Sequence, residues 1–391
     1  MKICLVNTFY YPDQCGGAEL SVKVLADSLV KSGHDVFVIT TGHQDKIEVV
    51  DGVRIYRISI VNIYSLNYRG WANNFFSFLW HIIDTCNYPT AWKVAKILRR
   101  ESPNIVHTNN LKGISVAIWP IAKRLGLKVV HTLRDYYLLC PKGTMFHDGV
   151  NCAHPCFVCS AYNSKRRQLS SHVDVVVGNS NFILQRHLNH RFFSYAQTHV
   201  CFNGYNKALV ELSPTSSGTD FKIGYIGRIG PFKGIELLLE AFCTLVTGTA
   251  TLYLAGSGEQ KYEASLRERY NSPFIVFEGF VRPEDFLSRI DVLVVPSLWH
   301  EPLPRVVFEG YAYGVPTIAA RRGGIPEIVE HEITGLLFDP SERGSLANAI
   351  HRFMDPVFRE PMREAAFRKS QEFKPERIIA DYLNVYKGQK L

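Results

Sequence analysis

The stretch "DVLVVPSLWHEPLPRVVFEGYAYGVPTIAA", residues 291–320, contains the pattern from which the fold is predicted. An apolar run at 291–297 is followed by a helical pattern over 305–313 that ends at Gly314, and then by a second apolar run at 316–320. Short apolar runs are typical of buried strands, and a glycine often follows the last turn of a helix. The stretch therefore predicts a strand, a helix and a second, parallel strand.

The same alternation extends to both sides of this stretch. In the second half of the chain, further strands are expected at residues 221–227, 250–256 and 274–279. In the first half, strands are expected at 2–7, 35–41, 105–109, 128–133 and 173–180, and a helix at 18–31 before Gly33. Apolar strands that alternate with helices indicate parallel sheets covered on both faces.

The alternation is interrupted by the polar, proline-containing segment "ELSPTSSGTD" at 211–220, whose composition is typical of a linker. A chain of 391 residues also exceeds the size of one average core. We therefore expect an α/β protein with two doubly wound domains, at residues 1–205 and 206–374. A C-terminal helix at 375–391 is expected to pack back on the first domain. Ligands of such sheets bind beyond the carboxyl ends of the strands.

The composition argues against several classes of protein. With 46% hydrophobic and 20% charged residues, the chain matches a soluble globular protein rather than a disordered one. It has no run of about 18 uncharged apolar residues, and the N-terminal "MKICLVNTFYYP" is typical of a buried strand rather than of a signal peptide. A cytoplasmic location is therefore expected. The net charge of +8 comes from scattered residues without a long basic stripe, which argues against a nucleic-acid partner.

The segment "GYIGRIGPFKGIELLLEAF", residues 224–242, combines a strand, a glycine-rich turn and a helix. The N-terminus of a helix offers free N–H groups and a partial positive charge, and Arg228 and Lys233 lie in the turn before it. These two cations are suited to clamp a diphosphate. The spacing fits neither the Walker loop nor the G-x-G-x-x-G motif. Taken alone, the turn is equally compatible with two solvated surface cations.

Two glutamates of the opening stretch, Glu301 and Glu309, have seven residues between them. Pro302 and Pro304 suit the entry to a helix, because the first N–H groups of a helix have no partner inside it. Glu301 is then expected at the mouth of the helix and Glu309 further along it, both at the ligand-binding edge of the sheet. Carboxylates at such positions accept hydrogen bonds from sugar hydroxyls. The alternative is a helix-start acid favoured by the helix dipole and a second acid on a solvated helix face.

Several short motifs occur together in order: "GGAE" at 16–19, "GRIGPFKG" at 227–234, "AGSGE" at 255–259 and "PSLWHEPLPRVVFEGYAYGVPTIAARRGGIPE" at 296–327. In this combination the chain resembles the GT-B retaining glycosyltransferases of family four, or glycosyl transferases group 1, over nearly its whole length. The resemblance implies two Rossmann-like domains with a cleft between them. It further implies an N-terminal domain that binds a glycan or lipid-linked acceptor and a C-terminal domain that binds a nucleotide-sugar donor.

The resemblance also implies roles for residues of the C-terminal domain. Arg228 and Lys233 match the pair that binds the donor diphosphate. Glu301 matches the residue that contacts the transferred sugar, and Glu309 matches the residue that binds the ribose hydroxyls. Leu303 lies in the same donor-binding stretch. Arg228, Lys233 and Glu301 are therefore the expected catalytic residues.

Gly16 and Gly17 match the N-terminal glycine loop that, in this family, closes over the donor phosphates and helps to form the acceptor site. The absence of side chains there lets the backbone approach a ligand closely. Without the resemblance, two adjacent glycines indicate only a tight turn.

The reaction implied by the resemblance is displacement at an anomeric carbon with retention of configuration. Negative charge develops on the leaving diphosphate, where Arg228, Lys233 and helix N–H groups would stabilise it. The sequence has no Asp-x-Asp pair, so no cofactor is expected for catalysis, and the nucleotide sugar is a substrate. Two other classes remain open: a nucleotide-sugar 2-epimerase of similar architecture and a non-catalytic nucleotide-sugar binder.

The chain departs from the family pattern at two positions. Pro304 stands where family members often have glycine, and proline has no backbone N–H to donate to the sugar. Arg134 stands at or near the position of a histidine that contacts the donor sugar in related enzymes, and it is suited to a phosphate or to an acidic sugar or acceptor. His131 and Asp135 are further candidate contacts of the sugar or acceptor. The alternative for His131 is a core histidine, and the alternatives for Asp135 are a residue that orients Arg134 and a simple loop acid.

A cysteine cluster surrounds the loop-rich segment "HDGVNCAHPCFVCS", residues 147–160. Its spacing is C-x11-C-x3-C-x2-C, and its members are Cys140, Cys152, Cys156 and Cys159. Four cysteines this close suit a tetrahedral structural zinc site, with His147 and His154 as alternative ligands. Reduced thiols packed under a loop and an iron–sulfur cluster are the other interpretations. No catalytic role is expected for the cluster.

The segment "NYRGWANNFFSFLWHIIDTCNYPTAW", residues 67–92, is rich in aromatic side chains. On an amphipathic helix of the first domain, such side chains are suited to a lipid-linked acceptor or to a membrane surface. A stripe of apolar residues on a helix is also a common core pattern. Together with the net charge of +8, the segment suggests peripheral association with the inner face of a membrane.

Overall fold

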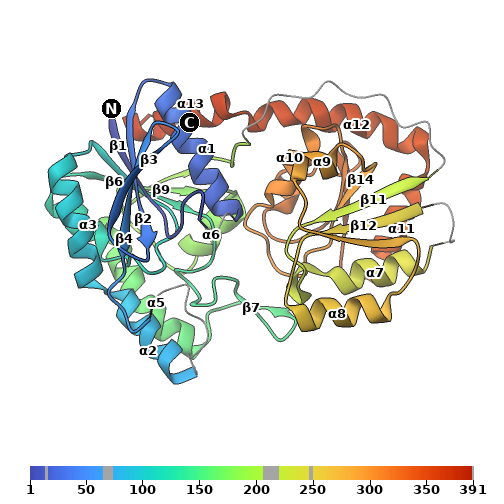
Figure 1. Ribbon diagram of the computed structural model, residues 1–391, viewed down its shortest axis with the longest axis horizontal. Helices are drawn as coiled ribbons and strands as arrows, with labels where there is room; N and C mark the ends of the chain where they lie inside the picture. Colours follow the sequence, from blue (N-terminus) through green and yellow to red (C-terminus); the bar gives the residue numbers. More distant parts are fainter. Residues whose placement is uncertain (14–15, 65–73, 206–219, 246–249, 390–391) are drawn as a thin grey trace. The chain divides into compact units, whose positions relative to one another are not determined.

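The computed structural model describes residues 1–13, 16–64, 74–205, 220–245 and 250–389 (Figure 1). The chain divides into two compact units. The first unit comprises Met1–Met145, Cys152–Gly204 and Pro375–Leu391, and the second comprises Phe146–Asn151 and Tyr205–Lys374. Most of the linker expected at 211–220 lies outside the described residues.

The first unit is built on an eight-stranded sheet with the strand order β10-β9-β6-β5-β1-β2-β4-β3. Neighbouring strands are parallel except β3 and β4, which pair antiparallel at one edge. The strands are β1 Lys2–Val6, β2 Asp35–Gly42, β3 Lys46–Val50, β4 Val53–Ser59, β5 Ile105–Thr108, β6 Lys128–Leu133, β9 Val175–Gly178 and β10 Gln197–Val200.

The helices of the first unit begin with α1, which starts at the glycine pair and buries Val22, Leu25 and Leu29 in the core. The last helix, α13, adds Ile378 and Tyr382 to the same core. The helices are α1 Gly17–Lys31, α2 Asn74–Thr85, α3 Tyr88–Glu101, α4 Ile118–Arg124, α5 Phe157–Leu169, α6 Asn181–Leu188 and α13 Pro375–Lys387, with a 3₁₀ turn, η1, at Ser170–His172.

Polar contacts also hold α13 in this unit. The buried imidazole of His107, on β5, lies with its Nδ1 2.7 Å from the Tyr386 hydroxyl and its Nε2 2.7 Å from Thr132 Oγ1. Burial holds the pKa of His107 well below its usual range. A neutral histidine with a partner at each nitrogen is a satisfied buried polar group, so α13 is an integral part of the first unit.

The second unit has a six-stranded parallel sheet with the order β13-β12-β11-β14-β15-β16. Its strands are β11 Phe221–Ile226, β12 Ala250–Ala255, β13 Ile275–Gly279, β14 Val292–Val295, β15 Thr317–Ala320 and β16 Gly335–Phe338. A small hairpin, β7 Phe146–His147 and β8 Val150–Asn151, belongs to this unit as well.

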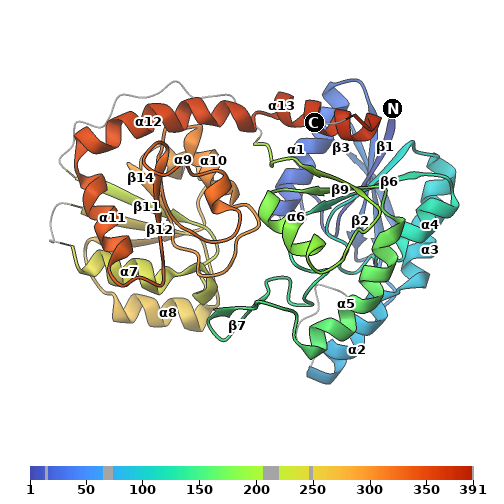
Figure 2. The same cartoon turned by 180° about the vertical axis from the view of Figure 1, so that it is seen from behind.

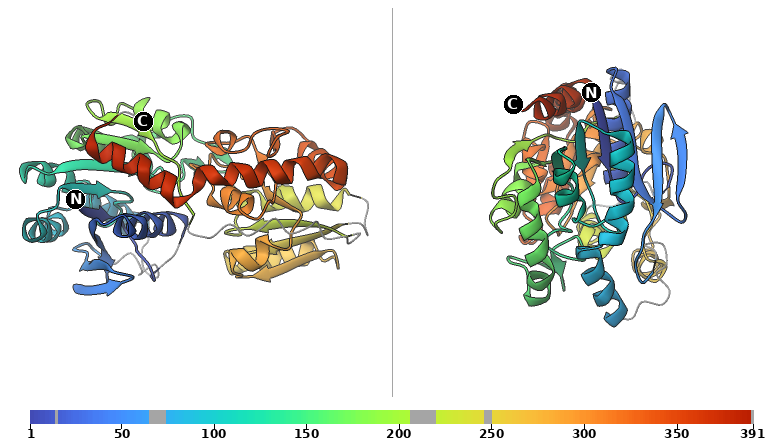
Figure 3. Two further views of the ribbon diagram at one scale, coloured as in Figure 1. Left: turned by 90° about the horizontal axis from the view of Figure 1, so that it is seen from above. Right: turned by 90° about the vertical axis from the view of Figure 1, so that its left-hand side faces the viewer.

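The helices of the second unit are α7 Ile235–Cys243, α8 Gln260–Arg269, α9 Pro283–Leu287, α10 Arg305–Tyr311, α11 Ser345–Met354 and α12 Pro356–Ser370, with 3₁₀ turns η2 Pro231–Lys233, η3 Ile325–Glu327 and η4 Gln371–Phe373. The long helix α12, orange-red in Figure 3, packs against α10 and α11.

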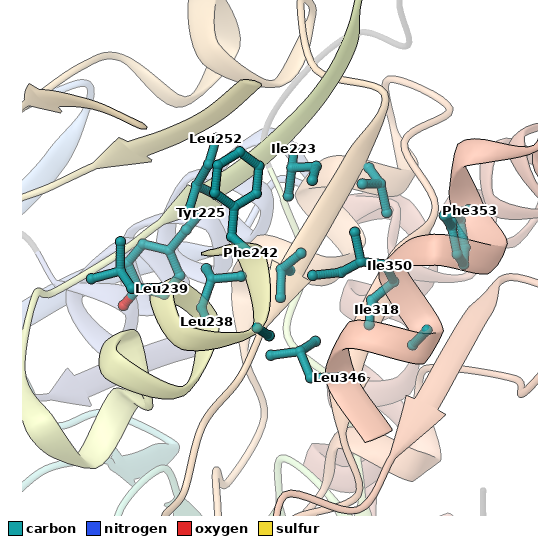
Figure 4. Close-up of a cluster of buried hydrophobic side chains, with 14 of the residues drawn as sticks. Ile223, Tyr225, Leu238, Leu239, Phe242, Leu252, Ile318, Leu346, Ile350 and Phe353 are labelled. Carbon is teal, nitrogen blue, oxygen red and sulfur yellow. The ribbon is translucent and has the colours of Figure 1, made fainter. Parts of the chain in front are cut away.

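Aliphatic side chains from strands and helices form the core of the second unit (Figure 4). Ile223 and Leu252, on neighbouring strands, pack with Leu238 and Leu239 of α7 and with Ile350 of α11. All five side chains are fully buried. Burial of one such side chain contributes about 1.5–3 kcal/mol of transfer free energy, so this face of the sheet is a rigid support for the loops above it.

The strand order fixes where each sheet can hold a ligand. β1 lies between β2 and β5, and β11 lies between β12 and β14. Chain connections therefore leave these central strands in opposite directions, which opens a crevice at their carboxyl ends. In the second unit this point lies after Ile226 and Val295, the last residues of β11 and β14.

The structure confirms the α/β class and the two doubly wound sheets expected from the alternation. Within the opening stretch, β14 and β15 are parallel and α10 connects them in sequence. No helix in the described parts of the chain is both long enough and apolar enough to cross a membrane. Of the aromatic segment at 67–92, residues 67–73 lie outside the described residues, and the rest forms α2 and the start of α3.

Candidate functional site

Two loops of the second unit meet at the carboxyl ends of β11 and β14. The loop after β11 carries Arg228 and Lys233, and the loop after β14 carries Glu301. The carbonyl oxygen of Phe232 accepts hydrogen bonds from the backbone N–H groups of Leu298 at 3.0 Å and Trp299 at 3.2 Å. The two segments whose residue types suit a diphosphate and a sugar are therefore parts of one structural site.

The centre of this site is an ion pair between Lys233 and Glu301. Lys233 Nζ lies 2.5 Å from Glu301 Oε1, and the same oxygen accepts a hydrogen bond of 2.7 Å from Ser297 Oγ. Glu301 is only 4% exposed, whereas about a quarter of the Lys233 side chain reaches solvent. A buried carboxylate needs such partners, so Glu301 is not a solvated acid at a helix start.

Two glycines allow the loops to approach this closely. Gly234 has φ +72°, and a Cβ built on it would lie 2.0 Å from the carbonyl oxygen of Pro296. Gly323 has φ +60°, and its Cβ would lie 2.1 Å from the carbonyl oxygen of Glu301. Only a residue without a side chain fits at such positions, so the backbones on both sides of Glu301 are in direct contact.

Arg228 and Lys233 lie near the same aromatic ring. The guanidinium of Arg228 is 5.9 Å from the centroid of the Phe232 ring, and Lys233 Nζ is 5.8 Å from that centroid and 5.4 Å from the Trp299 ring. Arg228 is exposed, and within the described residues it forms no ion pair. The arrangement presents one paired and one unpaired cation beside the N-terminus of α7, where an anion is favoured.

Glu309 lies on α10 and is paired with Arg305, one helical turn earlier. Arg305 Nε and Nη2 donate to Glu309 Oε1 at 3.1 and 2.8 Å, and both side chains are largely buried. Glu309 is therefore not on a solvated helix face. Pro304 is the N-cap of α10, where a missing N–H leaves no helical hydrogen bond unmade, and the preceding Leu303 is buried.

In the first unit, Gly16 and Gly17 form the start of α1. The backbone N–H of Gly16 donates to Glu19 Oε2 at 2.9 Å, so the Glu19 side chain reaches back and caps the start of the helix. Both glycines are exposed, whereas Glu19 is buried and burial raises its pKa. The loop is thus an accessible helix N-terminus at the carboxyl end of β1.

Arg134 and His131, on or just after β6, have different environments. Arg134 is buried, and it donates from Nε to Asn109 Oδ1 at 2.8 Å and from Nη1 to Asn203 Oδ1. His131 lies 5.1 Å from the Trp119 ring and is stacked 5.6 Å from the Phe193 ring. Burial lowers its pKa to about 3, so its packing supports the interpretation as a neutral core histidine.

Asp135 lines a pocket at the carboxyl ends of β5 and β6, together with Arg134 and Tyr137. Its Oδ1 accepts a hydrogen bond of 2.8 Å from the backbone N–H of Tyr137. Burial raises the pKa of Asp135 to about 7, against the opposing charges of Lys112 and Arg166. A carboxyl group in this state can accept or donate a hydrogen bond near neutral pH.

Beneath this pocket lies a buried network that no sequence pattern indicated. Asp84 accepts hydrogen bonds from the Tyr137 hydroxyl and from the Gly113 backbone N–H, the latter at 2.7 Å. Arg166 is fully buried, lies 4.2 Å from the Tyr137 ring and donates from Nη1 to the Tyr137 carbonyl oxygen at 2.7 Å. These residues are far apart in sequence and belong to no local motif, so only the tertiary structure brings them together.

Comparison with known proteins assigns the chain to a family. The family model of glycosyl transferases group 1 matches residues 220–355, and that of glycosyltransferase family 4 matches residues 15–209. A protein from the cps region of Klebsiella pneumoniae, itself uncharacterised, is 36% identical over 334 residues, which are 84% of this chain and 87% of that protein. The chain is a group 1 glycosyltransferase. This family assignment favours a transferase over the epimerase and the non-catalytic binder.

Solved structures show that the glycosyltransferase has the GT-B fold with two Rossmann-like domains. Sucrose-phosphate synthase from Thermosynechococcus elongatus matches with a TM-score of 0.76 and 21% identity, over 99% of this chain and 98% of that one. HepE of Anabaena, solved in complex with UDP, matches with a TM-score of 0.74 and 20% identity, over 99% of this chain and 100% of that one.

The cysteine cluster of the glycosyltransferase consists of free thiols in this structure. A hydrogen bond with Cys159 lowers the pKa of Cys140 to about 5, and burial raises the pKa of Cys152. Cys156 is exposed, and its pKa is lowered by a backbone hydrogen bond from Cys159. Among the described residues, no group of three or more His, Cys, Asp or Glu is arranged to hold a metal ion. The structural zinc, including its alternative ligands His147 and His154, stays a prediction.

Proposed function

We propose that this glycosyltransferase moves a sugar, with retention of anomeric configuration, from a nucleotide-diphosphate sugar to a glycan or lipid-linked acceptor in polysaccharide or glycolipid synthesis. The observation that carries the proposal is the Lys233–Glu301 pair, which joins the loops after β11 and β14 at the switch point of the sheet. The solved HepE complex with UDP supports the donor class, and the relative from a cps region supports the polysaccharide.

In this proposal the two cations act on the leaving group. Arg228 and Lys233 lie just before α7, so a diphosphate bound there receives both charges and the N–H groups of the helix start. Charge stabilisation of this kind usually contributes more to catalysis than any other effect, because the donors are in place before the charge develops. Glu301 would hold Lys233 before the donor arrives and contact the transferred sugar afterwards, while Glu309 would bind the ribose hydroxyls.

The first unit supplies the acceptor site in this proposal. Gly16 and Gly17 present the start of α1, and Asp135 lines a pocket at the ends of β5 and β6. Arg134 is fixed by Asn109 and Asn203, so it serves as an oriented cation for an acidic or phosphorylated group. The catalytic step itself requires no cofactor in this proposal.

A membrane surface is a further proposed partner, at the cytoplasmic face. Figure 2 shows α2 and α5 side by side in the first unit, and these helices contact one another. Exposed apolar side chains occur on α2, α3 and α5: Phe76, Ile82, Ile83, Tyr88, Trp92, Phe157 and Val158. Lys96 lies 5.1 Å from the Trp92 ring, so α3 also carries positive charge beside an exposed aromatic side chain, as interfacial helices do.

Vesicle binding tests the membrane partner. The full chain is expected to sediment with vesicles that contain anionic lipid and to be released by salt, because the attraction is partly electrostatic. Trp92→Ser/Phe157→Ser should weaken this binding without loss of folding, since both side chains are more than half exposed. If the wild-type chain does not bind anionic vesicles, a membrane surface is not one of its partners.

Ligand-dependent thermal stability tests the transferase proposal. UDP, GDP, ADP and their common sugar conjugates are added to the wild type and to Arg228→Ala/Lys233→Ala, with EDTA present. A nucleotide at about one hundred times its Kd stabilises the native state by about 2.7 kcal/mol. We expect such a shift with one nucleotide and its loss in the double variant. If the folded wild type responds to none of them, the donor site is refuted; if a donor binds, transfer and the anomeric configuration of the product are measured next.

A further inference from the structure

The hairpin β7–β8 contacts the loop that carries Glu301. Its last residue, Asn151, donates from Nδ2 to the carbonyl oxygen of Leu298 at 2.7 Å and accepts at Oδ1 from the backbone N–H of His300 at 2.8 Å. One amide side chain thus satisfies both a donor and an acceptor of the same short backbone segment. Paired bonds of this kind fix the orientation of the segment as well as its position.

Asn151 completes a set of contacts that hold residues 298–301 from several directions. The Phe232 carbonyl oxygen accepts from the first two N–H groups of the segment. On the other side, the Gly324 N–H donates to the Glu301 carbonyl oxygen at 2.7 Å, and the Gly323 N–H donates to His300 Nδ1 at 3.2 Å. Asn151 forms hydrogen bonds with the carbonyl oxygen of Leu298 and the N–H of His300. Backbone polar groups of a half-buried loop need such partners.

We infer that Asn151 is a positioning residue of the donor site. The inference rests on the proposed function: Asn151 fixes the backbone before Glu301, and Glu301 in turn fixes Lys233 through their 2.5 Å contact. A displacement of about 1 Å at such a group is enough to lower a reaction rate substantially, because catalysis depends on alignment. Asn151 itself contacts neither Glu301 nor Lys233 in this scheme, so its role is indirect. It directly precedes Cys152, so the residue that orders the loop at 298–301 belongs to the cysteine-rich segment at 147–160.

The test compares Asn151→Ala, Asn151→Asp and the control Val150→Ala in the full chain. Val150 lies on the same strand and is 67% exposed, so its truncation alters the hairpin without touching the loop. In Asn151→Ala we expect amide exchange at residues 297–301 to rise and kcat to fall, each by about tenfold, as for the loss of one or two hydrogen bonds. The affinity for UDP should fall much less than kcat, because UDP lacks the sugar that Glu301 would contact and the charges of Arg228 and Lys233 remain in the variant.

The Asn151→Asp variant separates the two hydrogen bonds. Its carboxylate still accepts from the His300 N–H but cannot donate to the Leu298 carbonyl oxygen, so its exchange and kcat are expected between those of Asn151→Ala and the wild type. Unchanged exchange at 297–301 in Asn151→Ala, or a lower melting temperature with unchanged kcat, would overturn the inference. If the wild type transfers no sugar at all, the proposed function fails, and the exchange measurement alone decides whether Asn151 holds the loop.

Discussion

Glu301 Oε1 is shared by an ammonium group and a hydroxyl group, from Lys233 and Ser297. Because the carboxylate is almost fully buried, it cannot exchange these partners for bulk water. A diphosphate that arrives beside Lys233 therefore competes with Glu301 for the ammonium. The residue-level consequence is that the pair sets the position of the cation before a donor binds.

Glu301→Gln tests this at the residue scale. Glutamine preserves the size and an acceptor but removes the charge, so Lys233 is no longer neutralised. We expect UDP affinity to stay within about threefold of wild type or to rise, as for a modest ion pair, and kcat for sugar transfer to fall by about 10²-fold or more. Titration calorimetry measures the affinity for UDP, and single-turnover kinetics measure the rate of sugar transfer. The control Glu332→Gln breaks an exposed pair with Arg352 and should change neither the UDP affinity nor kcat. If Glu301→Gln lowered the affinity and the rate equally, the proposed contact of Glu301 with the transferred sugar would be contradicted.

The buried carboxyl of Asp84 makes a prediction about pH. Burial raises its pKa from 3.8 to about 7 in the folded chain. Below pH 3.8 Asp84 is protonated in both the folded and the unfolded chain, so its contribution to the unfolding free energy does not vary with pH. Between about 3.8 and about 7 the carboxyl group ionises in the unfolded chain but stays protonated in the folded one, so the unfolding free energy falls as pH rises. In this window the difference in unfolding free energy between the wild type and Asp84→Asn should change by up to about 1.4 kcal/mol per pH unit in favour of the variant. Urea unfolding of both chains at pH 4.5, 6 and 8 measures it, and a difference that does not vary with pH would refute the raised pKa.

The candidate site was only partly predictable from the sequence. Arg228, Lys233, Glu301 and Glu309 lie in local motifs whose residue types suit phosphates and sugar hydroxyls, and the structure brings the first three together. Their partners were not predictable, because only the tertiary structure brings the Phe232 carbonyl oxygen, the Ser297 hydroxyl and the Asn151 amide next to the site. The Arg305–Glu309 pair is an exception: its i, i+4 spacing on a helix is a local signal that could have been used to predict it.

At the scale of elements, burial on both faces favours the prediction of a strand but does not ensure it, because β4 and β16 are largely buried and were not expected. All the strands expected from apolar runs are present, including β1, β5 and β14. The strands that were not expected are β3, β4, β10 and β16, with the hairpin β7–β8. β3 and β10 are edge strands with largely exposed residues, and the hairpin strands are two residues long, so their pairing leaves little apolar pattern in the sequence.

The tight turn before α7 gives a prediction at this scale. Gly234 and Gly279 share φ +72°, but a Cβ on Gly279 meets nothing within 4 Å, whereas one on Gly234 meets the Pro296 carbonyl oxygen. Gly279→Ala should therefore cost about 1–2 kcal/mol of unfolding free energy, from backbone strain alone. Gly234→Ala should cost a further ~1–3 kcal/mol, because the loops must separate, and should weaken UDP binding. Chemical denaturation of both variants measures the difference, and equal costs would mean that the loop contact at Pro296 contributes nothing.

At the scale of the molecule, the first unit is not a continuous piece of chain. Its core includes side chains of α13, which follows the whole of the second unit in sequence: Ile378, Ile379, Tyr382, Val385 and Tyr386. At about 1.5–3 kcal/mol for each buried side chain, their loss is comparable to the stability of a typical domain, about 5–15 kcal/mol. The boundary between the units in sequence therefore does not divide the protein into two independent halves.

A fragment experiment tests this. Residues 1–204 alone are expected to show no cooperative urea transition, because the face that α13 covers is exposed. The same fragment joined to residues 375–391 by a flexible linker should recover a cooperative transition. The matched control carries Tyr382→Ala and Tyr386→Ala in the added segment and should not recover it. Cooperative unfolding of residues 1–204 by themselves would contradict the prediction.

The place of α13 in the first unit also has a consequence for synthesis on the ribosome. Domains of most multidomain proteins fold in the order in which they leave the exit tunnel, N-terminal domain first. Here the first unit cannot complete its core until residues 375–387 have been synthesised. The second unit, Phe146–Asn151 and Tyr205–Lys374, is already complete when they emerge. The nascent first unit is thus the part that a chaperone would protect, and it reaches its native state only after residues 375–387 have left the ribosome.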